Sequence, residues 1–473
     1  MKYSRLTGIF AAAILTACGS GGGNSVAGID AGGTPDPVAT TVVSQGEITG
    51  FGSVIVNGVR YDTSSATFTI DDNPGSESDL AVGQVVTVRG TLGADGSTGT
   101  ASSIVFDDLV EGPVQAIDPD TETLIVLGQT VQVTVDTSFE ADIVPASLAG
   151  LAVGDIVEVS GFFDAAGIIV ASHIEIENPG GEFEVTGIAT NVQAGAMTLE
   201  INALVVDYSG ALVEDFPNGA PEAGQLVEAK GTTLGAGGEL IATRLEFEGG
   251  NDFGDGQVEI EGFITRFAAA TDFDIGGLPV TTTASTVYEN GNAADLDVNR
   301  KIEAEGSVNA SGVLVATKIE FKQAGFLRAE GLVEDVQAAR VTVMGIPINV
   351  RADTELKDSS DADVRAFGLD DLNVGDYVEI RGYSDATGFV ATRLERDDDR
   401  GEAALRGFVD SVAPPLFEIL GVTIATAPGT QFRDNDTPID SDTFFARAPG
   451  RLVDVDGTFS GGTLAAEEAS IED

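Results

Sequence analysis

One short segment recurs through the whole chain. It reads LNVGDYVEIRG at Leu372–Gly382, LAVGQVVTVRG at Leu80–Gly90 and LAVGDIVEVSG at Leu151–Gly161. Weaker copies end at Gly231, Gly306 and Gly457. The six closing glycines are 71, 70, 75, 76 and 75 residues apart. This regular spacing indicates a tandem array of six small units.

A tight turn is predicted at the start of each copy. The position seven residues before the closing glycine is Gly83, Gly154, Gly224, Asn299, Gly375 or Gly450. Glycine, and less readily asparagine, adopts a positive φ at little energetic cost. We therefore expect a left-handed backbone conformation at all six positions.

After this turn, apolar and polar residues alternate. In the fifth copy, Val378 and Ile380 lie on either side of Glu379. The same polar position holds Thr87, Glu158, Glu228, Glu303 and Asp454 in the other copies. A period of two is typical of a half-buried antiparallel strand. We expect the apolar side chains to face a core and the acidic ones to face water.

The charge limits the range of partners. The 473-residue chain has 76 Asp and Glu against 24 Lys and Arg, a net charge of −52. Such a surface repels phosphate backbones and anionic headgroups, so nucleic acid is not expected as a partner. A hydrophobic content of 42% is too high for a disordered chain. The 60 glycines and few aromatic residues suit short strands joined by many turns.

The N-terminus has the layout of a secretory signal. Lys2 and Arg5 precede a short apolar run, and Leu-Thr-Ala-Cys ends at Cys18. This ending resembles the lipobox of bacterial lipoproteins. The resemblance implies that residues 1–17 are removed, that Cys18 is acylated, and that Gly19 directs the protein to the outer membrane, in the periplasm or on the surface. An ordinary signal peptide with an incidental cysteine is the alternative. Residues 18–45, rich in Gly, Ser, Ala, Pro and Thr, are predicted to form a flexible tether.

Each unit is predicted to contain about five strands. Three strands come first, then a variable segment with an optional helical turn such as Ala362–Leu369, then the repeated strand and a closing strand such as Ala391–Leu394. This order matches a small OB-like barrel, and a short sandwich is the alternative. We therefore expect an all-β fold, a tandem array of six small antiparallel OB-like barrels. The predicted units, called repeats 1 to 6 below, are residues 46–107, 108–177, 178–248, 249–322, 323–397 and 398–473.

The first unit, from GEITGFGSVIVNG onward, resembles a domain found in bacterial secreted and lipid-anchored proteins, the domain of unknown function 5666. The resemblance is close for this unit and looser for the other five. It implies no particular activity, because the family has none assigned. The junctions between units are short, which predicts a rod or a loosely jointed string.

Few residues suggest chemistry. The chain has one histidine, His173, and one cysteine, Cys18, so no nucleophile–histidine pair and no transition-metal cluster is expected. His173 occupies a polar position of a closing strand and is expected to be exposed. Weak metal candidates are Asp434, Asp436, Asp440 and Asp442, although their spacing departs from known calcium loops. No catalytic residue and no cofactor is predicted.

These features predict a non-enzymatic, lipid-anchored protein of the cell envelope, either a β-domain scaffold and spacer or a surface-binding protein. Its expected partners are the membrane, through lipidated Cys18, an unidentified protein or glycan, and non-specifically bound divalent cations. A calcium-stiffened surface adhesin is the first alternative. A secreted hydrolase is the second, although no pair of carboxylates is singled out for it.

Overall fold

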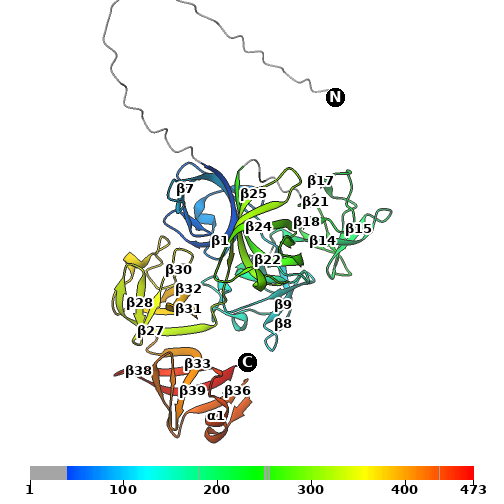
Figure 1. The fold of residues 1–473 in the computed structure, drawn as a ribbon. Helices are drawn as coiled ribbons and strands as arrows, with labels where there is room; N and C mark the ends of the chain where they lie inside the picture. Colours follow the sequence, from blue (N-terminus) through cyan, green and yellow to red (C-terminus); the bar gives the residue numbers. More distant parts are fainter. Residues whose placement is uncertain (1–39, 179, 250–252, 254–255, 436, 473) are drawn as a thin grey trace, which may run out of the picture. The chain divides into compact units, whose positions relative to one another are not determined.

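The computed structural model describes residues 40–178, 180–249, 253, 256–435 and 437–472, and it shows an all-β chain of repeated sheets (Figure 1). The described residues include one short α-helix, α1 (Ser441–Arg447), in repeat 6. None of the helices in this part of the chain is both long and apolar enough to cross a membrane. Cys18 and the predicted signal peptide lie outside the described residues, so the lipid anchor stays a prediction.

The strands follow one order in every repeat. Repeat 1 contains β1 (Thr40–Gly50), β2 (Val54–Val56), β3 (Val59–Asp62), β4 (Thr67–Ile70), β5 (Asn73–Gly75), β6 (Val85–Leu92) and β7 (Thr98–Phe106). Repeat 2 contains β8 (Val110–Asp118), β9 (Thr123–Val126), β10 (Gln129–Gln132), β11 (Ser138–Phe139), β12 (Ile156–Phe163) and β13 (Ile169–Glu177). Repeat 3 contains β14 (Phe183–Gln193), β15 (Thr198–Ile201), β16 (Leu204–Asp207), β17 (Leu212–Glu214), β18 (Leu226–Gly231), β19 (Thr233–Leu234), β20 (Leu240–Ile241) and β21 (Arg244–Phe247).

The second half of the chain repeats this order. Repeat 4 contains β22 (Gln257–Ala269), β23 (Asp272–Ile275), β24 (Leu278–Glu289), β25 (Lys301–Val308) and β26 (Leu314–Phe321). Repeat 5 contains β27 (Leu327–Gln337), β28 (Arg340–Val343), β29 (Ile346–Asn349), β30 (Glu355–Asp358), β31 (Tyr377–Asp385) and β32 (Gly388–Asp397). Repeat 6 contains β33 (Ala403–Ala413), β34 (Leu416–Ile419), β35 (Val422–Ala425), β36 (Gln431–Asp434), β37 (Thr437–Ile439), β38 (Leu452–Ser460) and β39 (Thr463–Glu472).

Within a repeat, five strands pair in a closed circuit, so that the last pairing leads back to the first strand. In repeat 5, β27 pairs antiparallel with β28 and β28 with β29. Strand β29 then runs parallel to β32, which pairs with β31, and β31 pairs back to β27. The other repeats have the same circuit, with the last strand of repeat 3 divided into β20 and β21.

Each sheet passes through two repeats. Parallel pairing of β1 with β22 joins repeats 1 and 4. Antiparallel pairing of β8 with β14 joins repeats 2 and 3, and β27 with β33 joins repeats 5 and 6. Repeats 5 and 6 also share one hydrophobic cluster, as do repeats 2 and 3. The expected loose string of separate units is therefore wrong for these pairs, because opening strands that would be sheet edges pair with each other.

The predicted turns and core positions are confirmed. Gly83, Gly154, Gly224, Gly375, Gly450 and Asn299 all have a positive φ, between 63° and 101°. Val378 and Ile380 are fully buried, and the apolar positions of the other repeated strands are buried as well. The closing glycine has a different physical role. In five repeats it lies at a β-bulge. A Cβ on Gly382 would overlap the Val390 carbonyl oxygen of the neighbouring strand, so only glycine fits there.

Three details differ from the prediction. Residues 40–45, assigned to the tether, belong to β1. Residues 362–368 form turns without a helix, and a 3-10 turn follows at Leu369–Asp371. The acidic positions do not all face water, since Glu158, Glu228 and Glu303 are only 7%, 4% and 3% exposed. For Glu158 another repeat contacts this face: the side chain of Gln84 in repeat 1 donates a hydrogen bond to Glu158 at 3.4 Å.

Candidate functional site

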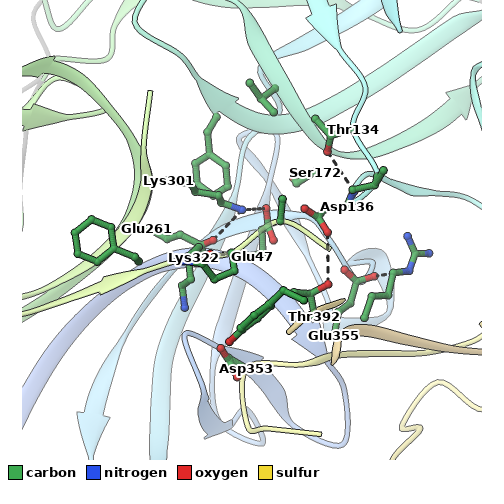
Figure 2. A pocket seen from close by; sticks show the side chains of 18 of the residues that line it. Glu47, Thr134, Asp136, Ser172, Glu261, Lys301, Lys322, Asp353, Glu355 and Thr392 are labelled. Carbon is green, nitrogen blue, oxygen red and sulfur yellow. Dashed lines mark hydrogen bonds and ion pairs between the residues drawn. The ribbon is translucent and has the colours of Figure 1, made fainter. Parts of the chain in front are cut away.

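A cavity of about 490 Å³ lies among repeats 1, 2, 4 and 5 (Figure 2). At its centre Lys301, on β25, points at Glu47 of β1 and Glu261 of β22. The Lys301 Nζ lies 2.7 Å from the Glu47 Oε1 and 2.9 Å from the Glu261 Oε1. It also lies 4.8 Å from the centre of the Phe162 ring of repeat 2, within the range of a cation–π interaction.

The opposite wall comes from repeats 2 and 5. Asp136, which follows β10, accepts hydrogen bonds from the Gly325 backbone N–H at 2.9 Å and from the Thr392 hydroxyl at 3.5 Å. Arg393 of β32 lies 3.3 Å from the Glu355 carboxylate. The cavity is therefore lined by charged groups that already have partners.

Burial sets the charge states in this cavity. It raises the pKa of Glu47 to about 7, although the Lys301 charge works in the opposite direction. Burial also raises the pKa of Asp136, again against nearby positive charges. For Lys301 itself, burial lowers the pKa, and the Glu261 and Glu47 charges outweigh it, so the ammonium stays charged. The cavity residues thus form ion pairs that hold repeats together, with no histidine or cysteine among them to act as a base or nucleophile.

A second group of charges lies where repeats 1, 2 and 3 meet. Asp71 follows β4, Asp108 lies in the link between β7 and β8, and Glu184 is on β14. Their nearest carboxylate oxygens all lie within 4.8 Å of one another. Backbone bonding places them there, because the Thr186 N–H donates to the Leu109 carbonyl at 2.9 Å.

Two members of this group have carboxylate oxygens without hydrogen-bond partners. Asp108 is 1% exposed, and neither of its carboxylate oxygens has a partner. The Glu184 Oε1 is also without one, whereas its Oε2 lies 2.8 Å from the Lys230 Nζ. Buried polar atoms are almost always paired, so an unpaired carboxylate indicates room for a ligand or a proton. Burial, followed by the Glu184 and Glu158 charges, raises the pKa of Asp108 well above its ordinary value.

Glutamates also face each other across neighbouring strands. In repeats 2 to 5, the repeated strand pairs with the closing strand, as β12 does with β13. This pairing places Glu158 opposite Glu175, Glu228 opposite Glu246, Glu303 opposite Glu320 and Glu379 opposite Glu395. Like charges in this arrangement repel. In repeats 3, 4 and 5 a cation two residues before the second glutamate lies against it: Arg244, Lys318 and Arg393.

Repeat 2 has His173 at this position, and the expectation of an exposed histidine is wrong. His173 is 1% exposed, because Gly83 of repeat 1 packs on it. Its Nε2 faces Glu140 and Glu175, at 3.8 and 4.0 Å. A sequence signal was present, namely that a single histidine replaces the cation of three other repeats.

Three of the four acidic candidates predicted in repeat 6 lie in the described part of the chain, and these three do not form a group of potential metal ligands. Asp434 accepts a hydrogen bond from Arg447 at 2.5 Å. Asp440 caps α1, accepting from the Thr443 N–H at 2.8 Å, and Asp442 is exposed in the first turn of that helix. Asp436 lies outside the described residues. The groups of three or more potential ligands found in the described part of the chain lie in repeats 1 to 4 instead.

Fold and sites define a tandem β-repeat protein whose repeats meet through buried charges. Five segments match the family described as Domain of unknown function (DUF5666): residues 42–105, 111–175, 261–320, 330–395 and 406–469. Because these segments cover more than half of the chain, the protein belongs to this family. No curated protein matches the chain. Residues 178–248 are outside the matched segments but have the strand circuit of the other repeats.

Proposed function

We propose that the protein is a non-enzymatic, lipid-anchored scaffold of the cell envelope, built from six OB-like β-domains and held at the outer membrane by Cys18. The observation that carries this proposal is the pairing of opening strands between repeats, β1 with β22, β8 with β14 and β27 with β33. Backbone hydrogen bonds across domain boundaries resist bending far more than a flexible linker does. Such an array keeps a fixed spacing, which is what a scaffold or spacer requires.

The order of strand pairing supports the OB-like part of this proposal. In repeat 5, β27 pairs with β28 and β31, and β29 runs parallel to β32. A circuit of five strands with an insertion before the fourth is the order expected of an OB-like barrel. Barrels of this kind present binding surfaces on loops and on one sheet face, so a surface-binding role for a protein or glycan partner is compatible with the scaffold.

Side chains add links between repeats that belong to different pairs. Lys357 of repeat 5 donates to the Phe139 carbonyl of repeat 2 at 2.7 Å. Arg365, also in repeat 5, donates to the Leu80 carbonyl of repeat 1 at 2.7 Å, and its guanidinium lies 3.8 Å from the centre of the Phe51 ring. Most basic residues of this acidic chain thus serve contacts within the protein, which supports a structural role.

The anchor is tested by the variant Cys18→Ala. Without the thiol no lipid can be attached, so we expect the variant to leave the membrane fraction and to lose its acyl-chain mass. Fractionation of the native envelope and intact-mass spectrometry measure both. A variant that stays in the outer membrane, or a wild-type protein that carries no acyl chain, would contradict the anchor. Cross-linking in the same envelope identifies what the scaffold holds.

A calcium-stiffened array is a second candidate, favoured by the unpaired oxygens of Asp108. Calcium binds six to eight oxygens, and the three carboxylates of Asp71, Asp108 and Glu184 supply part of such a set. A cation bound there would tie together repeats 1, 2 and 3. The Lys230 ammonium nearby reduces the net negative charge, so affinity in the range of about 10⁻⁴–10⁻³ M, as in extracellular modules, is expected.

Calorimetric titration of the soluble Cys18→Ala protein tests this candidate. Calcium should give a saturable heat that sodium chloride of equal ionic strength does not. Asp108→Asn should abolish the heat, whereas Asp434→Asn in repeat 6 should leave it unchanged. Loss of the heat in Asp434→Asn but not in Asp108→Asn would place the calcium in repeat 6 instead.

A further inference from the structure

The strongest unassigned feature is the environment of His173 in repeat 2. Parallel pairing of β11 with β13 aligns Ser138 with His173. Glu140 is two residues beyond Ser138, and Glu175 is two residues beyond His173. Because side chains two residues apart in a strand share a face, both carboxylates lie on the side of the imidazole. All three side chains belong to repeat 2.

The same arrangement in repeats 3 and 4 is built around a cation. Arg244 lies 3.1 Å from Glu214 and also pairs with Glu246. Lys318 lies 3.3 Å from Glu289 and 3.2 Å from Glu320. Each basic side chain thus bridges two glutamates on neighbouring strands. In repeat 2 the two glutamates are present, as Glu140 and Glu175, but the residue between them is a histidine.

The histidine does not bridge its glutamates. The Nε2 is 3.8 Å from the Glu140 Oε2 and 4.0 Å from the Glu175 Oε2, too far for hydrogen bonds. Neither ring nitrogen has a hydrogen-bond partner, although the residue is 1% exposed. A buried imidazole without partners is costly. A Lewis-acidic cation that accepts lone pairs from the imidazole nitrogen and from both carboxylates would satisfy all three groups.

The three side chains lie close enough together to act on one ion. The nearest ligand atoms of Glu140, His173 and Glu175 all lie within 4.8 Å of one another. Glu158, which is 7% exposed, lies directly opposite Glu175 on β12.

We propose that His173, Glu140 and Glu175 bind a divalent transition metal of the zinc class, which takes the place of the cation found in repeats 3 and 4. In a tetrahedral site with metal–ligand bonds of about 2.0–2.2 Å, neighbouring ligand atoms lie about 3.3–3.6 Å apart. The distances of 3.8 and 4.0 Å are slightly longer, and a small rotation of the half-exposed Glu140 and of Glu175 toward the ion would close the difference. An imidazole with two carboxylates favours zinc or a similar metal over calcium, which prefers oxygen ligands.

Access and coordination number fit this metal. The Glu140 side chain is 41% exposed, so an ion can enter past it and water can fill a fourth position. The two cations of repeat 5 that act on the ring have partners of their own: Lys357 donates to the Phe139 carbonyl, and Arg393 is paired with Glu355 and Glu395. The site therefore holds three protein ligands on one side and solvent on the other.

Selective labelling makes the test direct, because the chain has one histidine. The full Cys18→Ala chain is labelled with ¹⁵N-histidine, which leaves two imidazole nitrogens to observe, and the substitution also removes the only competing thiol. Zinc added at pH 7 should shift the Nε2 resonance and saturate at one equivalent. Cobalt should give a visible absorption band with the same stoichiometry, and zinc should displace it.

Variants decide whether the ligands are the proposed ones. Glu140→Gln, at a half-exposed position, should keep the fold and weaken zinc binding at least about tenfold, and His173→Gln should abolish the cobalt band. Asp142→Asn, an exposed acid two residues beyond Glu140, should bind like the parent. Nitrogen shifts typical of an imidazolium at pH 7, no saturation, or full affinity in Glu140→Gln would each overturn the proposal.

Discussion

Replacing Val378 by aspartate is expected to unfold repeats 5 and 6 together. Val378 is fully buried on β31 and belongs to a hydrophobic cluster that runs from Leu327 in repeat 5 to Ile471 in repeat 6. The change removes about 1.5–3 kcal/mol of apolar burial. It also forces an unpaired carboxylate into the core, which costs several kcal/mol more. The sum is comparable to the whole stability of a small domain.

The matched control for this prediction is Val374→Asp. Val374 lies four residues earlier in the same repeated segment and is 67% exposed, so the same chemical change should alter the free energy of unfolding by less than about 0.5 kcal/mol. Limited proteolysis and circular dichroism of the full chain measure both variants. Equal damage from the two substitutions would show that the core face of the repeated strand has been assigned wrongly.

The stability of the chain is expected to fall as the pH rises from 5 to 8, opposite to the usual acid denaturation. Burial, followed by the Glu303 charge, raises the pKa of Glu259 to about 8. Burial raises the pKa of Glu303 to about 7, partly offset by Lys322. Both pKa values exceed the ordinary value of 4.5. Between pH 4.5 and about 8 the folded protein holds protons on these two carboxyl groups that the unfolded chain has released. The free energy of unfolding therefore decreases as the pH rises.

The variant Glu259→Gln isolates this effect. Ser44 of β1 donates to the Glu259 Oε2 at 2.8 Å across the pairing of repeats 1 and 4, and a glutamine oxygen can accept the same bond. The variant should match the wild type at pH 5 and melt several degrees higher at pH 8. Groups with lowered pKa, such as Glu379 at about 2, titrate below this window. A wild-type melting temperature that rises from pH 5 to pH 8 would contradict the prediction.

The local part of the fold follows from sequence period alone. The spacing of closing glycines predicts the repeats, and the turn positions need a positive φ whatever surrounds them. Alternation in the repeated strand identifies Val378 and Ile380 as core because a pleated strand has only two faces. These are short-range properties, which neighbouring residues determine.

The acidic face shows what sequence period cannot decide. Alternation indicates which side chains share a face, but not which distant segments pack against that face. Glu303 is 3% exposed, and Lys322, at the end of the same repeat, lies 2.7 Å from its carboxylate. Glu379 was expected to face water, yet Arg328 and Arg381 hold it. Contacts between distant segments decided both outcomes.

The candidate sites were missed for the same reason. Asp71, Asp108 and Glu184 come from three repeats and share no motif. For His173, reasoning by analogy with the polar position of other closing strands predicted exposure, but Arg393 at that position in repeat 5 is itself only 7% exposed. Aligning the repeats by strand register, rather than reading one at a time, brings out the substitution of histidine for a cation.

The pairing of β1 with β22 has a consequence for how the chain can be made. Its paired residues, such as Val42 and Gln257, are separated by about three repeats of chain, so the first strand to be synthesised must wait for residues 257–260 before this edge is covered. Repeats 2 and 3 pair with each other inside this interval. Contacts so distant in sequence form slowly. Assembly is therefore nested rather than sequential, and a chain truncated after repeat 3 would carry an open, aggregation-prone edge at its own N-terminus.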